Sequence, residues 1–282
     1  MKKRPSIAYP YLIWSIIFIV FPLFIVLYYS FTSKVNGATV FSLENYKTLF
    51  SVDYIKVFYR SLKLAFLSTI LCLLLGYPIA YIISKMKTKK RNIYILLFIL
   101  PMWMNFLLRT YSWMAILGKN GFVQRFLNLI GITGVNLLYT DFAVMLGMIY
   151  NFLPFMVLPI YTSLINTDND LVNAAYDLGA NKMQVFCKVV FPLSLPGVMS
   201  GITMVFMPAV STFVISRLLG GGQYMLLGNL IEQQFTTAGN WNFGSAISIF
   251  MMILILISMA IMSKLDNNNE EGGKNYCLKK LE

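Results

Sequence analysis

The side chains that most often carry chemistry are scarce in this 282-residue chain, which has no histidine and only 11 acidic residues. Histidine is the commonest general base near neutral pH and a frequent metal ligand, so its absence excludes the enzymes and metal sites that depend on it. The three cysteines, at positions 72, 187 and 277, show no C-x-x-C spacing. We therefore expect inert thiols, no disulfide framework, no catalytic residues and no metal site.

A nucleotide site is not predicted either. A phosphate-binding loop needs the form G-x-x-x-x-G-K-[ST], because its backbone N–H groups and lysine hold the phosphates while its hydroxyl holds Mg²⁺. The nearest stretch, Gly272-Gly273-Lys274, lacks both the spacing and the hydroxyl residue. We expect the chain to bind no cofactor, so any ATP chemistry must come from another subunit.

A polar stretch at residues 165–194 predicts a docking element instead. Thr167 and Asp170 have the spacing of a capping box, which marks the start of a helix. Apolar side chains then follow at helical spacing: Leu171, Ala174, Ala175 and Leu178. Gly179 should end this helix, and Asn181 with Gln184 should start a second short helix that Pro192 ends.

A helix lying flat on the membrane is the alternative for this stretch. Membrane anchors usually carry Trp, Phe or Lys, whereas this face carries alanines. Asp168, Asp170 and Asp177 would also face an anionic surface. Small side chains favour the close approach of another protein, so we expect protein docking.

The segments that flank the loop at residues 165–194 and hold it in place are apolar. The chain is 58% hydrophobic, has a mean hydropathy of +0.69 and is 12% charged, against about 25% charged in soluble proteins. Six apolar stretches approach or exceed the length that crosses a bilayer: residues 11–31, 64–84, 92–116, 142–164, 195–216 and 243–263. The pattern predicts an all-α membrane protein with six transmembrane helices in one domain, 1–282, and an outer segment at 217–242.

Lysine and arginine cluster at residues 2–4, at 85–91 and after residue 263. Basic residues in short loops stay on the cytoplasmic side, so both termini and the loop 165–194 are expected inside. Much of the net charge of +12 is then a topology signal, and no nucleic acid partner is expected.

The docking loop carries a resemblance to a known family. The run Asn173-Ala174-Ala175, Gly179, Val189, Phe191 and Pro192 resembles the E-A-A, G, I-x-L-P motif of binding-protein-dependent ABC importer permeases, with all spacings kept. This resemblance implies a type I ABC importer permease fold in the bacterial inner membrane, with a non-catalytic, N-in/C-in chain and a cytoplasmic coupling helix. The implied coupling residues are Leu171, Asn173, Ala174, Ala175, Asp177, Leu178, Gly179 and Pro192. Asn173 departs from the motif, because it lacks the glutamate carboxylate that in the family can pair with a basic residue of the ATPase.

The stretches 42–46, 100–113 and 227–246 resemble spermidine/putrescine permeases of the PotB type. Asn242 departs from that pattern, where a proline usually follows the tryptophan. The resemblance implies half of a polyamine pathway, although related permeases carry organophosphonates, ferric ion or other small solutes. It also implies a second homologous permease (PotC-like), an ATPase dimer (PotA-like) that binds ATP and Mg²⁺, a solute-binding protein (PotD-like) and membrane lipid as partners.

Polar side chains inside helices are candidates for the pathway, because ionisable groups facing lipid are costly. Arg109, with Asn105 one turn before it, should make a structural or gating contact in the outer vestibule; a snorkelling arginine is the alternative. Glu232 and Trp241 are expected to receive a cation, unless they are a solvated acid and a membrane-belt tryptophan. Further candidates line helices four and five, although serine and threonine often bond the preceding turn: Tyr150, Asn151, Thr203, Ser211 and Thr212.

Two other classes of membrane protein fit the sequence less well. Mitochondrial carriers need three repeats with a Pro-x-[Asp/Glu]-x-x-[Lys/Arg] signature, which does not occur in the sequence. An intramembrane protease of the rhomboid type needs a serine nucleophile with histidine, and the chain has no histidine. An intramembrane enzyme therefore remains only a distant alternative.

Overall fold

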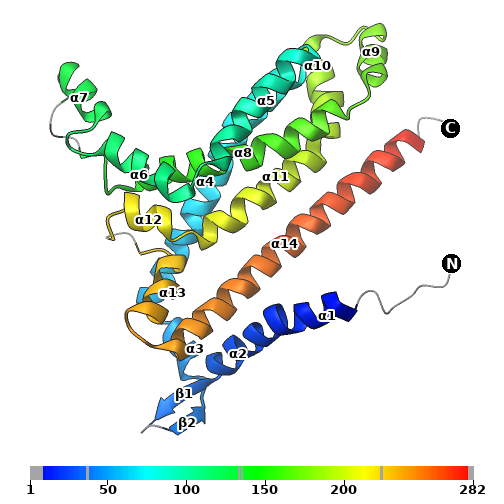
Figure 1. Ribbon diagram of the computed structural model, residues 1–282. Helices are drawn as coiled ribbons and strands as arrows, with labels where there is room; N and C mark the ends of the chain where they lie inside the picture. Colours follow the sequence, from blue (N-terminus) through cyan, green and yellow to red (C-terminus); the bar gives the residue numbers. More distant parts are fainter. Residues whose placement is uncertain (1–8, 36–37, 133, 135, 223–224, 279–282) are drawn as a thin grey trace.

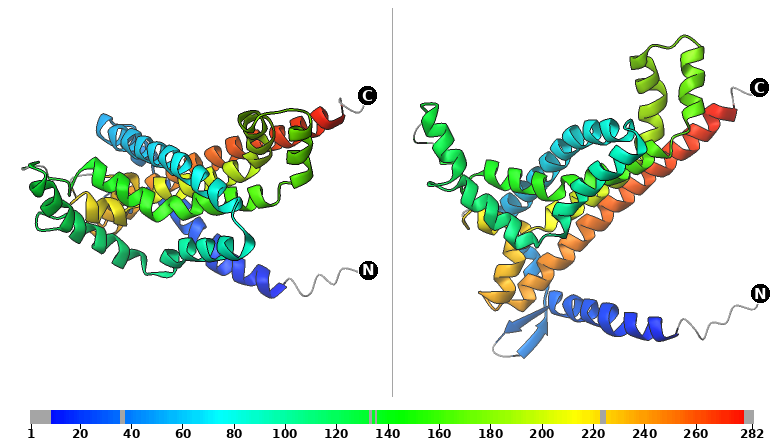
Figure 2. Two further views of the ribbon diagram at one scale, coloured as in Figure 1. Left: turned by 90° about the horizontal axis from the view of Figure 1, so that it is seen from above. Right: turned by 45° about the horizontal axis from the view of Figure 1, so that its top comes forward.

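The structure is a computed structural model that describes residues 9–35, 38–132, 134, 136–222 and 225–278. The basic residues 2–4, 279 and 280, used above for orientation, lie outside this described part. Over the described residues the fold is a bundle of helices with one small β-hairpin (Figure 1). In the views of Figures 1 and 2, the α9–α10 hairpin and the end of α14 lie on the same side of the molecule.

Within the described residues, five helical segments are long and apolar enough to cross a membrane. The first, Tyr9–Ser30, joins α1 (Tyr9–Ser15), a π-helical turn (Ile16–Val20) and α2 (Phe21–Ser30). The others are α4 (Val52–Ser84), α8 (Asp141–Ile165), the segment Lys182–Ser211 and the part Trp241–Lys264 of α14 (Trp241–Leu278). A bent pair of helices makes a sixth crossing if it counts as one span. The predicted all-α architecture with six transmembrane helices is thus confirmed in outline.

The predicted continuous helix 92–116 is wrong. The chain forms α5 (Thr88–Trp103), breaks, and continues as α6 (Phe106–Leu117) and α7 (Phe122–Leu129) at 91° to α5. Met104 is extended, and the side chain of Asn105 accepts a hydrogen bond from Leu107 N at 2.8 Å. Asn105 is therefore a helix N-cap, and capping restarts the helix in a new direction inside an uncharged run.

The predicted span 195–216 and the helix end at Pro192 are also wrong. One helical segment runs from α10 (Lys182–Val185) through a π-helical turn (Phe186–Val190) into α11 (Phe191–Ser211). Pro192 has no backbone N–H to donate to a helical hydrogen bond. The π-helical turn lies directly before Pro192, and its wider spacing lets the helix continue past the proline. At the other end Thr212 is extended, and a separate helix α12 (Val214–Leu219) follows.

The outer end holds short elements that the hydropathy pattern does not resolve. They are the antiparallel hairpin of β1 (Thr32–Val35) and β2 (Ala38–Phe41), α3 (Glu44–Leu49) and α13 (Leu227–Thr236). Ser61 Oγ of α4 accepts a hydrogen bond from Leu227 N at 2.8 Å, which holds α13 against the bundle. The outer segment 217–242 is therefore folded around α13.

The core lies where α4, α8 and α11 pack against one another. Glycines allow close approach there: a Cβ atom on Gly197 would lie 2.5 Å from Ser163 Cβ and 2.7 Å from Pro159 O. By contrast, the first apolar segment, Tyr9–Ser30, diverges from the bundle in Figure 1, and its side chains are almost all exposed. Such a long apolar surface needs lipid or another protein to cover it.

Candidate functional site: the cytoplasmic loop and the outer pockets

The loop predicted to dock a partner forms α9 (Asn169–Asp177), which projects beyond α8 and α10 in Figure 1. Its N-cap is Asp168, whose Oδ1 accepts a hydrogen bond from Asp170 N at 2.9 Å. Thr167 instead donates its hydroxyl to Ser163 O at 3.1 Å, at the end of α8. The predicted Thr167–Asp170 capping box is therefore wrong by one residue, because Asp168 is also a strong capping side chain.

The predicted end of α9 and the predicted start of the next helix are confirmed. Gly179 has φ +81°, and Ala180 N donates to Ala175 O at 3.1 Å, which closes the last turn. Asn181 and Gln184 then form a reciprocal capping box, with distances of 2.8 and 2.9 Å. These two signals make a sharp turn between α9 and α10.

The surface of α9 is open to a partner. Leu178 is 86% exposed, and the residues Leu171, Asn173, Ala174 and Asp177 are exposed as well. Ala175 is half-buried and Pro192 is exposed. The inward contact comes from Val172, which is buried and which the sequence pattern did not indicate. The predicted coupling residues thus present a surface of apolar, small and polar side chains that includes the Asp177 carboxylate, and their role stays a prediction.

Four rings at the base of this loop form a cluster that the sequence did not indicate. We call Tyr77, Tyr81, Phe186 and Phe191 the aromatic latch. Tyr77 lies 5.9 Å from Phe186 and 5.6 Å from Phe191, and Tyr81 lies 5.3 Å from Phe186, all between ring centroids. The Tyr77 hydroxyl also shares a buried hydrogen bond of 2.9 Å with Ser194 Oγ. The aromatic latch therefore joins α4 to the helix that leaves the docking loop.

Arg109 of α6 is only 8% exposed, and its Nε and Nη1 atoms are buried without a hydrogen-bond partner in the described chain. A snorkelling arginine places its head group in water, so this burial favours a structural or gating contact. Asn105 does not pair with the guanidinium, because its side-chain oxygen caps α6. The predicted contact in the outer vestibule stays a prediction without an identified acceptor.

The candidate lining residues of α8 and α11 are mostly occupied by their own helices. Asn151 Nδ2 donates to Gly147 O at 2.9 Å, Thr203 Oγ1 to Met199 O at 2.9 Å, and Ser211 Oγ to Met207 O at 3.2 Å. Tyr150 packs edge-on against Trp113, and Thr212 is buried at the break after α11. Their lining role stays a prediction.

Glu232 and Trp241 belong to different pockets. Glu232 forms an ion pair with Arg217 and lines a pocket of about 190 Å³ with Arg217, Gly222, Met225, Asn229, Gln233 and Thr237. Trp241 packs between Phe235, at 5.6 Å, and Tyr29, at 6.5 Å, and lines a larger pocket of about 600 Å³. Neither interpretation of Glu232 from the sequence included an arginine partner.

The chain matches one protein family over residues 2–268, described as binding-protein-dependent transport system inner membrane component. It is 39% identical over 250 residues to the spermidine/putrescine transport system permease protein PotB of Haemophilus influenzae, covering 86% of this chain and 87% of the relative. It is 36% identical over 253 residues to PotB of Escherichia coli K12, covering 88% and 92%.

Solved structures agree in fold. A bacterial ABC transporter involved in the import of the acidic polysaccharide alginate superposes with a TM-score of 0.80 at 18% identity, covering 94% of this chain and 96% of that chain. The MetNI methionine ABC transporter in an inward-facing conformation superposes with a TM-score of 0.56 at 17% identity, covering 76% and 95%. At these identities the likeness concerns the fold alone.

Proposed function

Because the chain belongs to the family of binding-protein-dependent transport system inner membrane components, we propose that it is the permease subunit of an ATP-driven importer of polyamines. It is a multi-pass inner-membrane protein of the type I ABC importer permease fold, and it is not an enzyme. The observation that carries the proposal is the exposed α9 with its Gly179 cap, on a chain whose relatives are named as spermidine/putrescine permeases.

An importer of this family works with an ATPase and an extracytoplasmic solute-binding protein. We propose that the ATPase is a PotA-like dimer that binds ATP and Mg²⁺, and that the binding protein is PotD-like. A two-fold ATPase dimer presents two docking clefts, whereas the described part of this chain has one docking loop. A second, PotC-like permease would supply the other loop and the other half of the pathway.

The proposed coupling mechanism rests on the exposed face of α9 and on the contacts that join α9 to the bundle. Closure of the ATPase pair moves α9, whose exposed face combines apolar and small side chains with the carboxylates of Asp170 and Asp177. Such a face fits a cleft that is apolar at its centre and basic or polar at its rim. The capped turn at Gly179 and the aromatic latch make α9, α11 and α4 move together. Because α4, α8 and α11 pack against one another, movement of the loop reaches the centre of the bundle.

The function is tested by purifying the tagged chain with its associated subunits and reconstituting them in liposomes. Uptake of radiolabelled spermidine that requires ATP, and that putrescine inhibits, is the expected result. An organophosphonate and ferric ion serve as the competing cargoes. ATP-dependent uptake of either one without uptake of spermidine would contradict the polyamine assignment and leave the permease role intact.

Glu232 is expected to contribute little to polyamine capture, because Arg217 already neutralises its carboxylate. The pair is partly exposed, and such pairs are worth about 1 kcal/mol or less. We therefore predict that Glu232→Gln changes the KM for spermidine uptake by about fivefold or less. Initial uptake rates at several spermidine concentrations check this; a tenfold rise in KM at unchanged ATPase activity would restore Glu232 as a receptor for the cation.

A further inference from the structure

The short helix α7 (Phe122–Leu129), at the outer end of the molecule, is amphipathic and has one uncovered face. The described chain buries none of its side chains. Three large apolar side chains, spaced four and three residues apart, share one side of the helix. We call them the apolar ridge: Phe122, Phe126 and Leu129, which are 76%, 55% and 85% exposed. Such a ridge is unfavourable in water, so lipid or protein must cover it.

A different edge of α7 contacts the rest of the chain. Val123 packs against the hydrophobic core, and Gln124 lines a pocket of about 360 Å³ together with Leu117 and Tyr139. Within the described residues, no side chain of α7 forms a hydrogen bond or an ion pair with another element. The chain thus sets which edge of α7 faces the bundle, and it leaves the apolar ridge without a partner.

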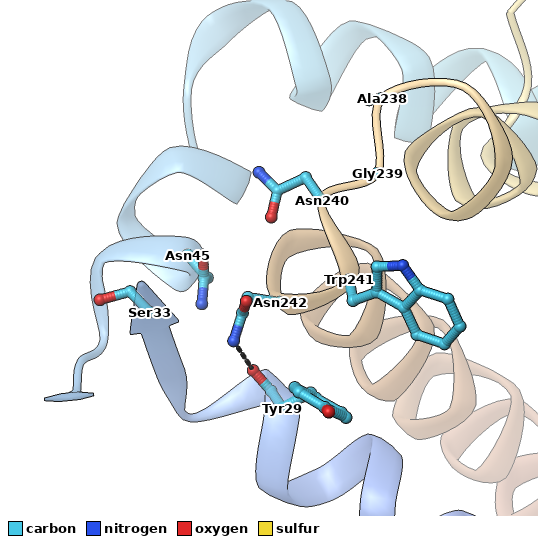
Figure 3. Close-up of a pocket in the computed structure, with 8 residues that line it drawn as sticks. All are labelled: Tyr29, Ser33, Asn45, Ala238, Gly239, Asn240, Trp241 and Asn242. Atoms are coloured by element: carbon cyan, nitrogen blue, oxygen red, sulfur yellow. Dashed lines mark hydrogen bonds between the residues drawn. The ribbon is translucent and has the colours of Figure 1, made fainter. Parts of the chain in front are cut away.

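Other outer elements are held by buried amides instead. Figure 3 shows the pocket of about 600 Å³ beside the turn into α14, where Asn242 Nδ2 donates to Tyr29 O at 3.2 Å. Asn242 Nδ2 and Asn45 Nδ2 also donate to Thr32 O, at 2.7 and 2.9 Å. These bonds tie α14, α3 and the hairpin together. Because α7 has no such bonds, further support for it must come through the apolar ridge.

The direction of α7 places the apolar ridge at a membrane surface. The segment Phe106–Leu129, which contains α6 and α7, lies at 91° to α5, and the two together can form one bent crossing. A helix at right angles to a crossing helix runs along the bilayer and not through it. In Figures 1 and 2, α7 lies at the opposite end of the molecule from the α9–α10 hairpin. Since that hairpin is cytoplasmic, α7 lies at the outer surface.

The composition of α7 favours lipid over protein as the cover. The docking helix α9 carries alanines and aspartates, whereas the apolar ridge carries two phenylalanines and a leucine, with Lys119 and Arg125 exposed in the same segment. No acidic residue occurs between Gly118 and Thr140. Bulky apolar side chains on one face, with basic side chains beside them, are typical of helices in a bilayer interface. Anionic lipid phosphates attract the basic side chains there.

We propose that α7 is an interfacial anchor in the outer leaflet of the membrane. The apolar ridge inserts among the acyl chains, and Arg125 and Lys119 lie at the level of the lipid phosphates. Because α7 follows α6 and contacts it, the anchor holds the outer end of the bent pair at the membrane surface while the docking loop moves at the other end. This contact with lipid does not depend on which solute is carried.

The test measures the depth of α7 in the complete transporter, reconstituted in vesicles of phosphatidylethanolamine and phosphatidylglycerol. A nitroxide label on Phe126→Cys reports on the apolar ridge, and the same label on Asn128→Cys is the matched control on the polar side of α7. Both versions carry Cys187→Ser and Cys277→Ser, whereas Cys72 is 0% exposed and stays. Collisions of the label with oxygen, which concentrates among acyl chains, are compared with collisions with a water-soluble nickel chelate.

We expect the oxygen-to-nickel collision ratio to be at least about threefold higher at position 126 than at position 128. Adding the solute-binding protein should leave both ratios unchanged. Equal ratios at the two positions would mean that water surrounds α7, and they would overturn the proposal. Low collision rates with both reagents at position 126, before or after the solute-binding protein is added, would mean that protein covers the apolar ridge and would overturn it as well.

The variants Phe122→Cys and Leu129→Cys repeat the measurement along the apolar ridge, so the result does not rest on the assembly of a single variant. Both should give the ratio found at position 126, and a ratio equal to that of position 128 at both positions would contradict the anchor. The measurement requires no transport. Its outcome is therefore separate from that of the uptake experiment, which tests the proposed function.

Discussion

Replacing Gly179 with valine is expected to uncouple transport from ATP hydrolysis. Gly179 ends α9 with φ +81°, in the left-handed region that β-branched side chains avoid. A Cβ atom there would meet nothing within 4 Å, so the penalty is conformational and not steric. At about 1–2 kcal/mol, it disfavours the capped geometry of α9 by roughly 5- to 30-fold. ATP-driven uptake should fall by a similar factor while membrane insertion stays normal.

Gly131→Val is the matched control for this experiment. Gly131 has φ +87°, and a Cβ atom there would also meet nothing within 4 Å, but it lies after α7, away from α9. The same backbone penalty is then placed outside the docking loop, and uptake should remain near the wild-type rate. Normal uptake in Gly179→Val, or an equal loss in both variants, would show that the α9 cap does not transmit the movement.

The apolar spans and the local end signals were predictable from the sequence. Spans follow from composition over about 20 residues, and the Gly179 and Asn181 signals act within one turn, where neighbours in sequence are neighbours in space. The helix break at Asn105 could not be predicted from the hydropathy pattern. A hydropathy window averages over a capping residue, so it cannot separate a straight span from two helices at 91°.

Contacts between distant segments could not be predicted from one sequence. Asn45 and Asn242 share Thr32 O although they lie on different helices, and Tyr77 meets Phe186 across two elements of the bundle. Side-chain periodicity reports which face of a helix is apolar and not which partner covers it. Glu232 looked like a free acid for the same reason, because Arg217 belongs to a separate helix.

Removing one ring of the aromatic latch should reduce the uptake obtained per ATP hydrolysed. The docking loop itself is unchanged in such a variant. Tyr77 of α4 contacts Phe186 and Phe191, which follow the loop, and its hydroxyl pairs with Ser194. Tyr77→Leu keeps an apolar side chain but loses both ring pairs, each worth about 0.5–1.5 kcal/mol beyond area burial. The two pairs together are worth about 1–3 kcal/mol, so we predict roughly 5- to 150-fold fewer spermidine molecules taken up per ATP hydrolysed.

Two further variants distinguish coupling from general stability. Tyr77→Phe keeps the rings and loses only the hydroxyl hydrogen bond, so it should retain most of the coupling. Tyr54→Leu removes a comparable ring pair, with Phe243 at 4.9 Å, at the outer end of the same helix. That variant should lower thermal stability but leave uptake per ATP unchanged, because the outer contact lies outside the path from α9 to α4. An equal fall in uptake per ATP for Tyr54→Leu and Tyr77→Leu would mean that α4 responds to any loss of packing, and the aromatic latch would have no specific part in coupling.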